Sequence, residues 1–161
     1  MEGMTNRRKF LAQSAATLAS VTAANAQKSK KKAVSPIIVF EKPIQTLEYD
    51  RMGEILAKMG LQGIEATIRK GGHIAPEEAE EEVPKMVAAL AENGQKALIA
   101  ATNVSEANAA SEKFLRILKV NGITKYRSNY YRYDLKKEML PQVRENAAKL
   151  KNLAAMNKEI G

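Results

Sequence analysis

The sequence has no cysteine, no tryptophan and only one histidine, His73, among its 161 residues. Without cysteine the chain forms no disulfide, and it offers neither a thiolate metal ligand nor a cysteine nucleophile. A single histidine excludes every metal site that needs two of them. Two kinds of motif are missing as well. No G-x-G-x-x-G or P-loop follows an apolar run, and there is no G-x-S-x-G elbow, which argues against nucleotide-cofactor enzymes and serine hydrolases.

The positive charge of the chain is concentrated near its start. The 26 Lys and Arg residues outnumber 18 Asp and Glu, for a formal net charge of +8. Residues 1–26 contribute +2 of this excess, and the four lysines between residues 27 and 32 contribute +4. The remaining residues carry only +2, so the charge predicts no nucleic-acid partner. With 45% hydrophobic and 27% charged residues, the chain has the composition of a globular protein.

Residues 1–26 are predicted to be a twin-arginine signal peptide. Two adjacent arginines, Arg7 and Arg8, precede a mild apolar run at residues 11–24. Ala24 and Ala26 supply the small side chains that a signal peptidase requires. The run is too polar and too short to span a membrane. We therefore expect the twin-arginine export machinery as a partner, cleavage after Ala26, a periplasmic location and a basic leader over residues 27–35. The alternative is a chance basic start to a cytoplasmic protein.

From residue 36 onward the chain repeats one unit four times. Each copy has a short apolar run, a polar loop and an amphipathic stretch that ends at a glycine. The runs cover residues 36–40, 63–68, 96–101 and 123–127, and the closing glycines are Gly60, Gly94, Gly122 and Gly161. Strands that alternate with helices at this spacing are βα units, whose strands are parallel. Residues 36–161 are therefore predicted to be an α/β domain with a parallel four-stranded sheet.

Two of the predicted helices have distinctive ends or faces. In the second, acidic residues crowd positions 77–82, where the helix dipole favours negative charge, and Pro84 is expected to open the regular part. In the fourth, four apolar residues recur at helical spacing, which predicts a single packed face. These residues are Val143, Ala147, Leu150 and Ala154.

Two of the predicted strands have polar faces, which is unusual in a parallel sheet. The residues that share these faces are Glu65, Thr67 and Arg69 in the second strand and Lys125, Arg127 and Asn129 in the fourth. Charged side chains do not face a helix layer without partners. Two interpretations remain open. The polar faces point into a barrel interior that holds water or a polar ligand, or Glu65, Arg69 and Arg127 form internal salt bridges.

The loops that follow the strands hold the candidate site residues, because chemistry in βα folds gathers at the carboxyl ends of the strands. The loop at residues 69–73 has two glycines, which allow a ligand to approach the backbone closely, and it ends in His73. Four of the five tyrosines lie within residues 126–133. Their rings and hydroxyls suit sugars, and they equally suit ordinary packing. For His73, a structural hydrogen bond and a ligand contact both remain possible.

Four short motifs in this chain resemble the first half of one family. They are FEKPIQ at residues 40–45, the Gly-Gly-His loop at 69–73, Thr102–Asn103 and YYRYD at 130–134. The family is that of the sugar phosphate isomerases/epimerases with a xylose isomerase-like TIM barrel. The resemblance implies a (β/α)8 fold of which residues 36–161 are the first four βα units, a half-barrel. It also implies a sugar or polyol substrate and a divalent metal that assists a proton or hydride shift between adjacent carbons.

The resemblance assigns substrate contacts to this chain but no catalytic residue. The candidate sugar-binding residues are Lys42, Arg69, His73, Asn103, Tyr131 and Arg132. In the family the metal ligands lie mainly at the ends of strands five to eight, and this chain provides only the first four. We therefore expect that this N-terminal part binds no metal and is inactive by itself.

Other functions and assemblies remain as alternatives. A non-enzymatic periplasmic sugar-binding module would need no metal. A DNA-repair endonuclease on the same barrel is disfavoured by the export signal and by the placement of the charge. Four βα units also leave the sheet open at the first and fourth strands, so a homodimer that closes the half-barrel is a further expectation.

Overall fold

The computed structural model describes residues 35–161. The predicted signal peptide, residues 1–26, lies outside the described residues, and so does the predicted basic leader, 27–35, except for its last residue. Residues Pro36–Gly161 form one unit of the fold.

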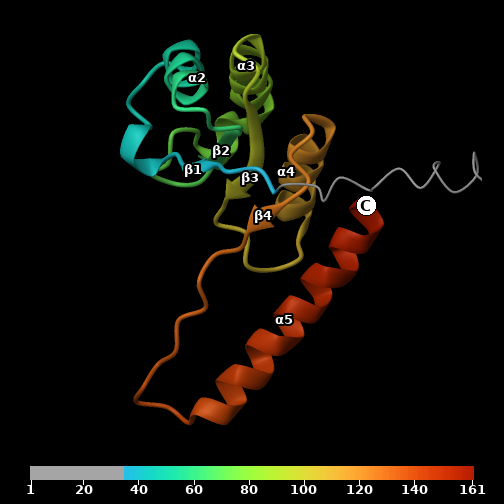
Figure 1. Ribbon diagram of the computed structural model, residues 1–161. Helices are drawn as coiled ribbons and strands as arrows, with labels where there is room; N and C mark the ends of the chain where they lie inside the picture. Colours follow the sequence, from blue (N-terminus) through green and yellow to red (C-terminus); the bar gives the residue numbers. More distant parts are fainter. Residues whose placement is uncertain (1–34) are drawn as a thin grey trace, which may run out of the picture. The chain divides into compact units, whose positions relative to one another are not determined.

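The described residues alternate strands and helices in the predicted order (Figure 1). The strands are β1 (Val39–Phe40), β2 (Gly63–Thr67), β3 (Lys96–Ala101) and β4 (Tyr126–Arg127). The α-helices are α2 (Tyr49–Lys58), α3 (Ala79–Glu92), α4 (Ala109–Val120) and α5 (Met139–Ile160), and the 3-10 helices are η1 (Lys42–Ile44) and η2 (Pro76–Glu78). The strands pair in chain order and every pair is parallel. The prediction of an α/β fold with a parallel four-stranded sheet is confirmed.

The two outer strands are shorter than the apolar runs predicted. β1 and β4 have two residues each, whereas β2 and β3 reach five and six. An outer strand has a partner on one side only. Its length is therefore limited by the hydrogen bonds that it makes to that single neighbour. Ile37 still accepts a hydrogen bond from the backbone of Gln62 at 3.0 Å, so the chain runs beside β2 before β1 begins.

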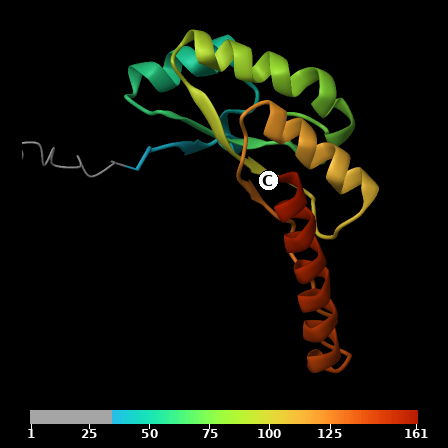
Figure 2. The ribbon, with the colours of Figure 1, turned by 90° about the vertical axis from the view of Figure 1, so that its right-hand side faces the viewer.

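The helices cover one face of the sheet. In Figure 2, α2, α3 and α4 lie in an arc along the same side of the strands. Residues of β2 and its continuation that face them, Ile64, Ala66 and Ile68, are fully buried, as period-2 alternation requires. The alternate positions, among them Glu65, are on the opposite face, and Glu65 is only half-buried. The polar faces anticipated from the sequence therefore point away from the helix layer.

The core lies between the sheet and these three helices. Apolar side chains at helical spacing are buried in each helix, and they include Met52 and Leu56 of α2, Val83, Met86 and Leu90 of α3, and Phe114, Leu115 and Leu118 of α4. Burying one such side chain stabilises a fold by about 1.5–3 kcal/mol. Glycines with positive φ follow all three helices, at Gly60, Gly94 and Gly122, as the repeat pattern predicted.

The expected start of the second helix is wrong. α3 begins at Ala79, directly after η2, so that Pro84 is its sixth residue and not part of its first turn. The acidic residues Glu80, Glu81 and Glu82 occupy that first turn and suit the positive end of the helix dipole. Pro84 is exposed, so the backbone hydrogen bond it cannot donate is lost on the solvent side of the helix.

The predicted apolar stripe of α5 is not covered by any element within residues 35–161. Val143, Ala147, Leu150 and Ala154 are exposed, and the buried residues of α5 are Leu153 and Met156. Against the other described residues, the helix packs only near its C-terminal end. There Asn157 donates a hydrogen bond to the hydroxyl of Tyr126 in β4 at 2.9 Å, and Lys119 of α4 donates to the carbonyl of Ile160 at 2.9 Å. Periodicity locates an apolar stripe on a helix, but it does not identify which neighbour covers that stripe.

Among residues 35–161, no helix has the length and apolar character needed to cross a membrane.

Candidate functional site

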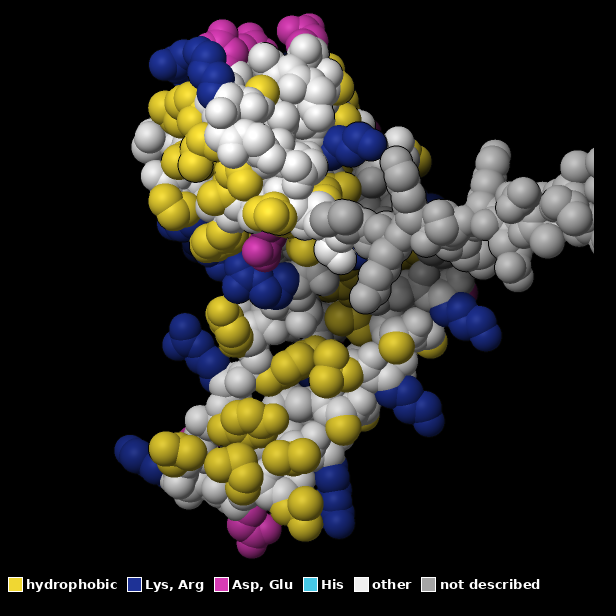
Figure 3. Space-filling model, in the orientation of Figure 1, with side chains coloured by type: hydrophobic (Ala, Val, Ile, Leu, Met, Phe, Trp, Pro, Cys, Tyr) yellow, Lys and Arg dark blue, Asp and Glu magenta, His cyan; other side chains and the backbone are white. Residues whose placement is uncertain are grey.

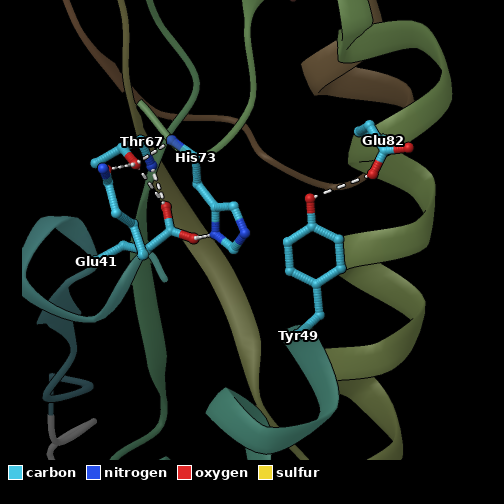
Figure 4. A network of polar contacts seen from close by, with 6 residues as sticks. Glu41, Tyr49, Thr67, His73 and Glu82 are labelled. Carbon is cyan, nitrogen blue, oxygen red and sulfur yellow. Dashed lines mark hydrogen bonds and ion pairs between the residues drawn. The ribbon is translucent and has the colours of Figure 1, made fainter. Parts of the chain in front are cut away.

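A buried carboxylate holds the only histidine of the chain in place (Figure 4). Glu41 directly follows β1, is 0% exposed, and places its Oε1 2.6 Å from the Nδ1 of His73. Its other oxygen, Oε2, accepts hydrogen bonds from the backbone N–H of Thr67 and from the Thr67 hydroxyl, the latter at 2.9 Å. Both oxygens of this buried carboxylate therefore have polar partners.

The loop between β2 and η2 brings His73 back to the end of β2. The backbone N–H of His73 donates to the carbonyl of Thr67 at 3.0 Å, and Ile68 and Ile74 form an isolated parallel bridge. Gly72 makes this tight return possible. A Cβ at Gly72 would lie 2.3 Å from the carbonyl oxygen of Thr67, which is closer than any real side chain comes. The chain's own backbone approaches this glycine closely.

The ring of Tyr49 packs beside the imidazole of His73. The rings of Tyr49 and His73 are tilted by 41° with their centroids 4.7 Å apart, and the Tyr49 hydroxyl donates to Oε2 of Glu82 at 3.4 Å. Burial, together with the negative charge of Glu82, raises the pKa of Tyr49 to about 12. Tyr49 therefore remains a neutral hydrogen-bond donor at physiological pH.

The pairing with Glu41 determines what His73 can do chemically. A carboxylate at Nδ1 favours the tautomer that carries its proton there, so Nε2 keeps a free lone pair. The side chain of His73 is partly exposed while that of Glu41 is not. A carboxylate–imidazole pair of this kind can accept a proton at Nε2 from a bound hydroxyl and return it.

Four of the six predicted site residues lie in or beside the 69–73 loop. Lys42 donates from Nζ to the carbonyl of Gly71 at 2.7 Å, and Asn103 accepts at Oδ1 from the backbone N–H of Lys70, also at 2.7 Å. Together with His73 they join the ends of β1, β2 and β3. Arg69 starts the same loop and is half-buried. In the structure, the side chains of Lys42 and Asn103 are hydrogen-bonded to the backbone of this loop.

The two predicted residues after β4 lie in a different setting. The Tyr131 hydroxyl donates to the backbone carbonyl of Ser105, which ties the loop after β4 to the loop after β3. Arg132 is exposed on that loop. No hydrogen bond within residues 35–161 joins Tyr131 or Arg132 to His73.

On the open face of the sheet, Arg127 is the centre of a second polar group. Its Nε lies 2.8 Å from Oε1 of Glu65, its guanidinium stands 5.1 Å over the ring of Phe40, and its NH1 donates to the hydroxyl of Tyr130 at 3.2 Å. Of the salt bridges considered from the sequence, the Glu65–Arg127 pair is present, and within the described residues Arg69 takes no part in it.

Sequence reasoning missed Glu41, Thr67 and Tyr49 as parts of the site. A signal existed for Glu41, since a carboxylate placed directly after an apolar run sits at the carboxyl end of a strand. Thr67 was recognised only as one member of a polar face. Tyr49 gave no signal, because its contact with His73 depends on how α2 packs.

The divalent metal that the resemblance implies has no matching donors here. Among residues 35–161, no three side chains of the His, Asp and Glu types gather closely enough to hold an ion. Both oxygens of Glu41 accept hydrogen bonds from Thr67 or His73. The described residues therefore do not fit a metal site.

One comparison with known proteins bears on the fold. No family model matches the sequence, and no curated protein matches it. Among solved structures, the chain is similar to D-psicose 3-epimerase, crystallised in the presence of D-fructose, with a TM-score of 0.53 and 14% sequence identity. The match covers 79% of this chain and 50% of the epimerase, so this chain spans about half the length of that protein. At this identity the likeness shows the fold alone: four parallel βα units arranged as in part of a TIM barrel.

Proposed function

We propose that this chain is the sugar-binding N-terminal part of an isomerase/epimerase-like barrel. The observation that carries the proposal is the Glu41–His73 pair at the carboxyl ends of β1 and β2, the edge at which barrels of this kind bind their substrates. The similar structure is a sugar epimerase in the presence of D-fructose, which suggests a ketohexose as the first ligand to test.

The geometry suits a polyhydroxylated ligand. His73 offers Nε2 as an acceptor for a hydroxyl, and the loop that it closes is lined by Lys42 and Asn103, which can donate to hydroxyl oxygens. Tyr49 limits the rotation of the imidazole, so the acceptor is held in one direction. A rigid acceptor at a strand end selects a ligand by the position of its hydroxyls.

The reaction itself would need more than this chain. Epimerisation or isomerisation removes a proton from one carbon and returns one to the same or an adjacent carbon. In this proposal His73 holds or moves a proton at a sugar hydroxyl, with Glu41 stabilising the imidazole. The remaining groups, including the metal ligands that the resemblance places in later strands, would come from outside residues 35–161. We propose that the chain by itself binds the sugar without converting it.

The experiment uses His73 as its own reporter, because a chain with one histidine gives one set of imidazole NMR signals. On titration of the full chain with D-fructose, we expect these signals to move saturably with a millimolar dissociation constant. His73→Gln should abolish binding measured by calorimetry, and Arg144→Gln, at an exposed position of α5, should leave it unchanged. If the imidazole signals do not respond to any hexose, the proposal is wrong.

A non-enzymatic sugar-binding module is the second candidate, favoured by the lack of a metal donor set among the described residues. The two candidates differ in their dependence on a divalent ion. Binding that is as tight with magnesium as without it, and that produces no epimer, supports the module. Conversion of D-fructose upon addition of a metal and the remaining barrel units would support the isomerase/epimerase.

We also propose export by the twin-arginine machinery, on the basis of residues 1–26. These residues fused to a reporter should direct it to the periplasm of a bacterial host in its folded form. Replacing both arginines, Arg7→Lys and Arg8→Lys, should retain it in the cytoplasm. Unchanged export of that double variant would indicate another route.

A further inference from the structure

An apolar stripe on α5 has no covering element among residues 35–161. Leu140 is 59% exposed, Val143 and Leu150 are also more than a third exposed, and Ala147 and Ala154 continue the same line. The spacing alternates between three and four residues, the pattern of a helix face that packs against another helix. Figure 3 shows hydrophobic side chains gathered over the lower part of the molecule, along α5 and the loop before it.

The stripe is separate from the face that α5 already uses. Leu153 and Met156 are buried, and the same end of α5 contacts α4 and is hydrogen-bonded to Tyr126 of β4. In a βα fold, the helix after a strand covers the groove between that strand and the next one. The exposed stripe of α5 therefore marks the place of a strand and a helix that would follow β4 in space.

In the part of the chain that the structure describes, each outer strand of the sheet has one side without a partner strand. In β1 and the residues beside it, the backbone groups of Ile37 and Glu41 are hydrogen-bonded to the β2 side. Alternate residues of a parallel strand point to opposite sides, so the backbone N–H and C=O of Phe40 point outward. In β4, Lys125 and Arg127 accept hydrogen bonds from β3, so the backbone of Tyr126 points outward. No strand within residues 35–161 pairs with either outer side.

The flank beside β1 is also apolar and exposed. Ile37 is 65% exposed and Met59, at the end of α2, is 66% exposed. The segments that carry these two residues are joined, because Ile37 is hydrogen-bonded to Gln62, three residues after Met59. Gly53 lies against Asn93, so it marks the side of α2 that meets the end of α3. Met59 lies about 120° around the helix axis from Gly53. This flank therefore faces away from α3.

We propose that two copies of this chain associate around a two-fold axis, with β4 and the α5 stripe of each copy packed against β1 and the α2 flank of the other. A closed barrel of this type has about eight strands, and the described residues of one copy supply four. One copy spans about half the length of the similar barrel protein. A second copy, with the same four βα units, could therefore form the other half of a barrel. A two-fold axis makes the β4–β1 junction twice and leaves no open edge.

The dimer would also enclose the candidate site, without supplying the metal ligands of later strands. The open face that carries Phe40, Glu65 and Arg127 would become the interior of a closed barrel, and the carboxyl ends of all the strands would meet on one side. The inference rests on the barrel architecture of the proposed function but not on its sugar. Mass measurements therefore test the dimer and sugar titrations test the sugar-binding function, and either proposal can be refuted without the other.

The first test is the mass of the full chain by sedimentation equilibrium and light scattering. We expect twice the mass of one chain at micromolar concentration. Leu140→Glu combined with Leu150→Glu should yield a monomer, because it places charges on the stripe. Ala148→Glu combined with Asn152→Glu makes the same change in net charge on an exposed part of α5 outside the stripe, and should leave the dimer intact. Circular dichroism confirms that both variants fold.

The second test identifies which surfaces meet. Because the native sequence has no cysteine, only the introduced cysteines can react with the cross-linker. In βα units with parallel strands the helices run antiparallel to the strands, so the C-terminal halves of α5 and α2 should lie together across the junction. A mixture of Ala154→Cys and Met59→Cys proteins should therefore cross-link with a short bismaleimide, and neither protein should cross-link with itself. A monomer at all concentrations, a dimer that survives the Leu140 and Leu150 substitutions, open-ended polymers, or self-cross-linking of Ala154→Cys would each overturn the proposal.

Discussion

Glu65 and Arg127 are 62 residues apart in the sequence and meet at 2.8 Å on the open face of the sheet. Glu65 is in β2 and Arg127 is in β4, so the pair bridges over β3. Arg127 also stands over the ring of Phe40 in β1. One guanidinium thus contacts side chains that span the whole described sheet, and it does so on the face that no helix within residues 35–161 covers.

A double-mutant cycle should detect this bridge. Glu65→Gln and Arg127→Gln are each expected to destabilise the fold, and their combination should cost less than their sum by about 0.5–1 kcal/mol, because both side chains are partly exposed. Urea unfolding followed by circular dichroism measures the difference. The Arg51–Glu54 pair on the surface of α2 is the control, with a smaller coupling expected. Strict additivity for Glu65 and Arg127 would mean that water screens the pair completely.

Loss of the Glu41 carboxylate should weaken the fold and release His73. Glu41→Gln leaves only one acceptor oxygen for the donors of Thr67 and His73, so we expect a loss of about 1.5–3 kcal/mol in the free energy of unfolding. Nitrogen NMR of the imidazole should show a shift from the Nδ1–H tautomer toward a mixture. Glu54→Gln, at an exposed position, should change stability by less than about 0.5 kcal/mol. An unchanged tautomer in Glu41→Gln would contradict the assigned role of Glu41.

The repeat of strand, loop, helix and glycine was sufficient to predict the four parallel βα units. Each unit is local, and short-range periodicity and turn residues encode it. Pairings between distant residues were harder. Nothing in the sequence assigns Glu41 to His73, because their contact depends on where the 69–73 loop returns to the sheet. The stripe of α5 shows the same limit, since its amphipathic pattern predicts burial but the described residues include no neighbour to bury it.

The neighbouring glycines of the 69–73 loop should respond differently to alanine. At Gly72 a Cβ would meet the backbone oxygens of Thr67 and Arg69 at 2.3 and 2.9 Å, so Gly72→Ala must distort the loop and should cost about 3 kcal/mol. Gly71 has φ of +70° and open space around it, so Gly71→Ala bears only the strain of that conformation, about 1 kcal/mol. Thermal and urea unfolding measure both. Equal losses would indicate that the loop does not return as tightly as described.

Raising the pH should remove a stabilising contribution of Tyr49. Burial and the charge of Glu82 raise its pKa from 10.0 to about 12 in the folded chain, so the fold favours the neutral phenol. Between pH 10 and 12 the unfolded chain loses this proton while the folded chain keeps it, and the free energy of unfolding therefore falls as the pH rises. The partial exposure of the ring limits the loss to about 1 kcal/mol. Unfolding measured across this range, together with phenolate absorbance, should show the decline in the native chain and a weaker decline in Tyr49→Phe. Tyr133→Phe, on the exposed loop after β4, should retain the native slope, and a native slope in Tyr49→Phe would assign the effect to another group.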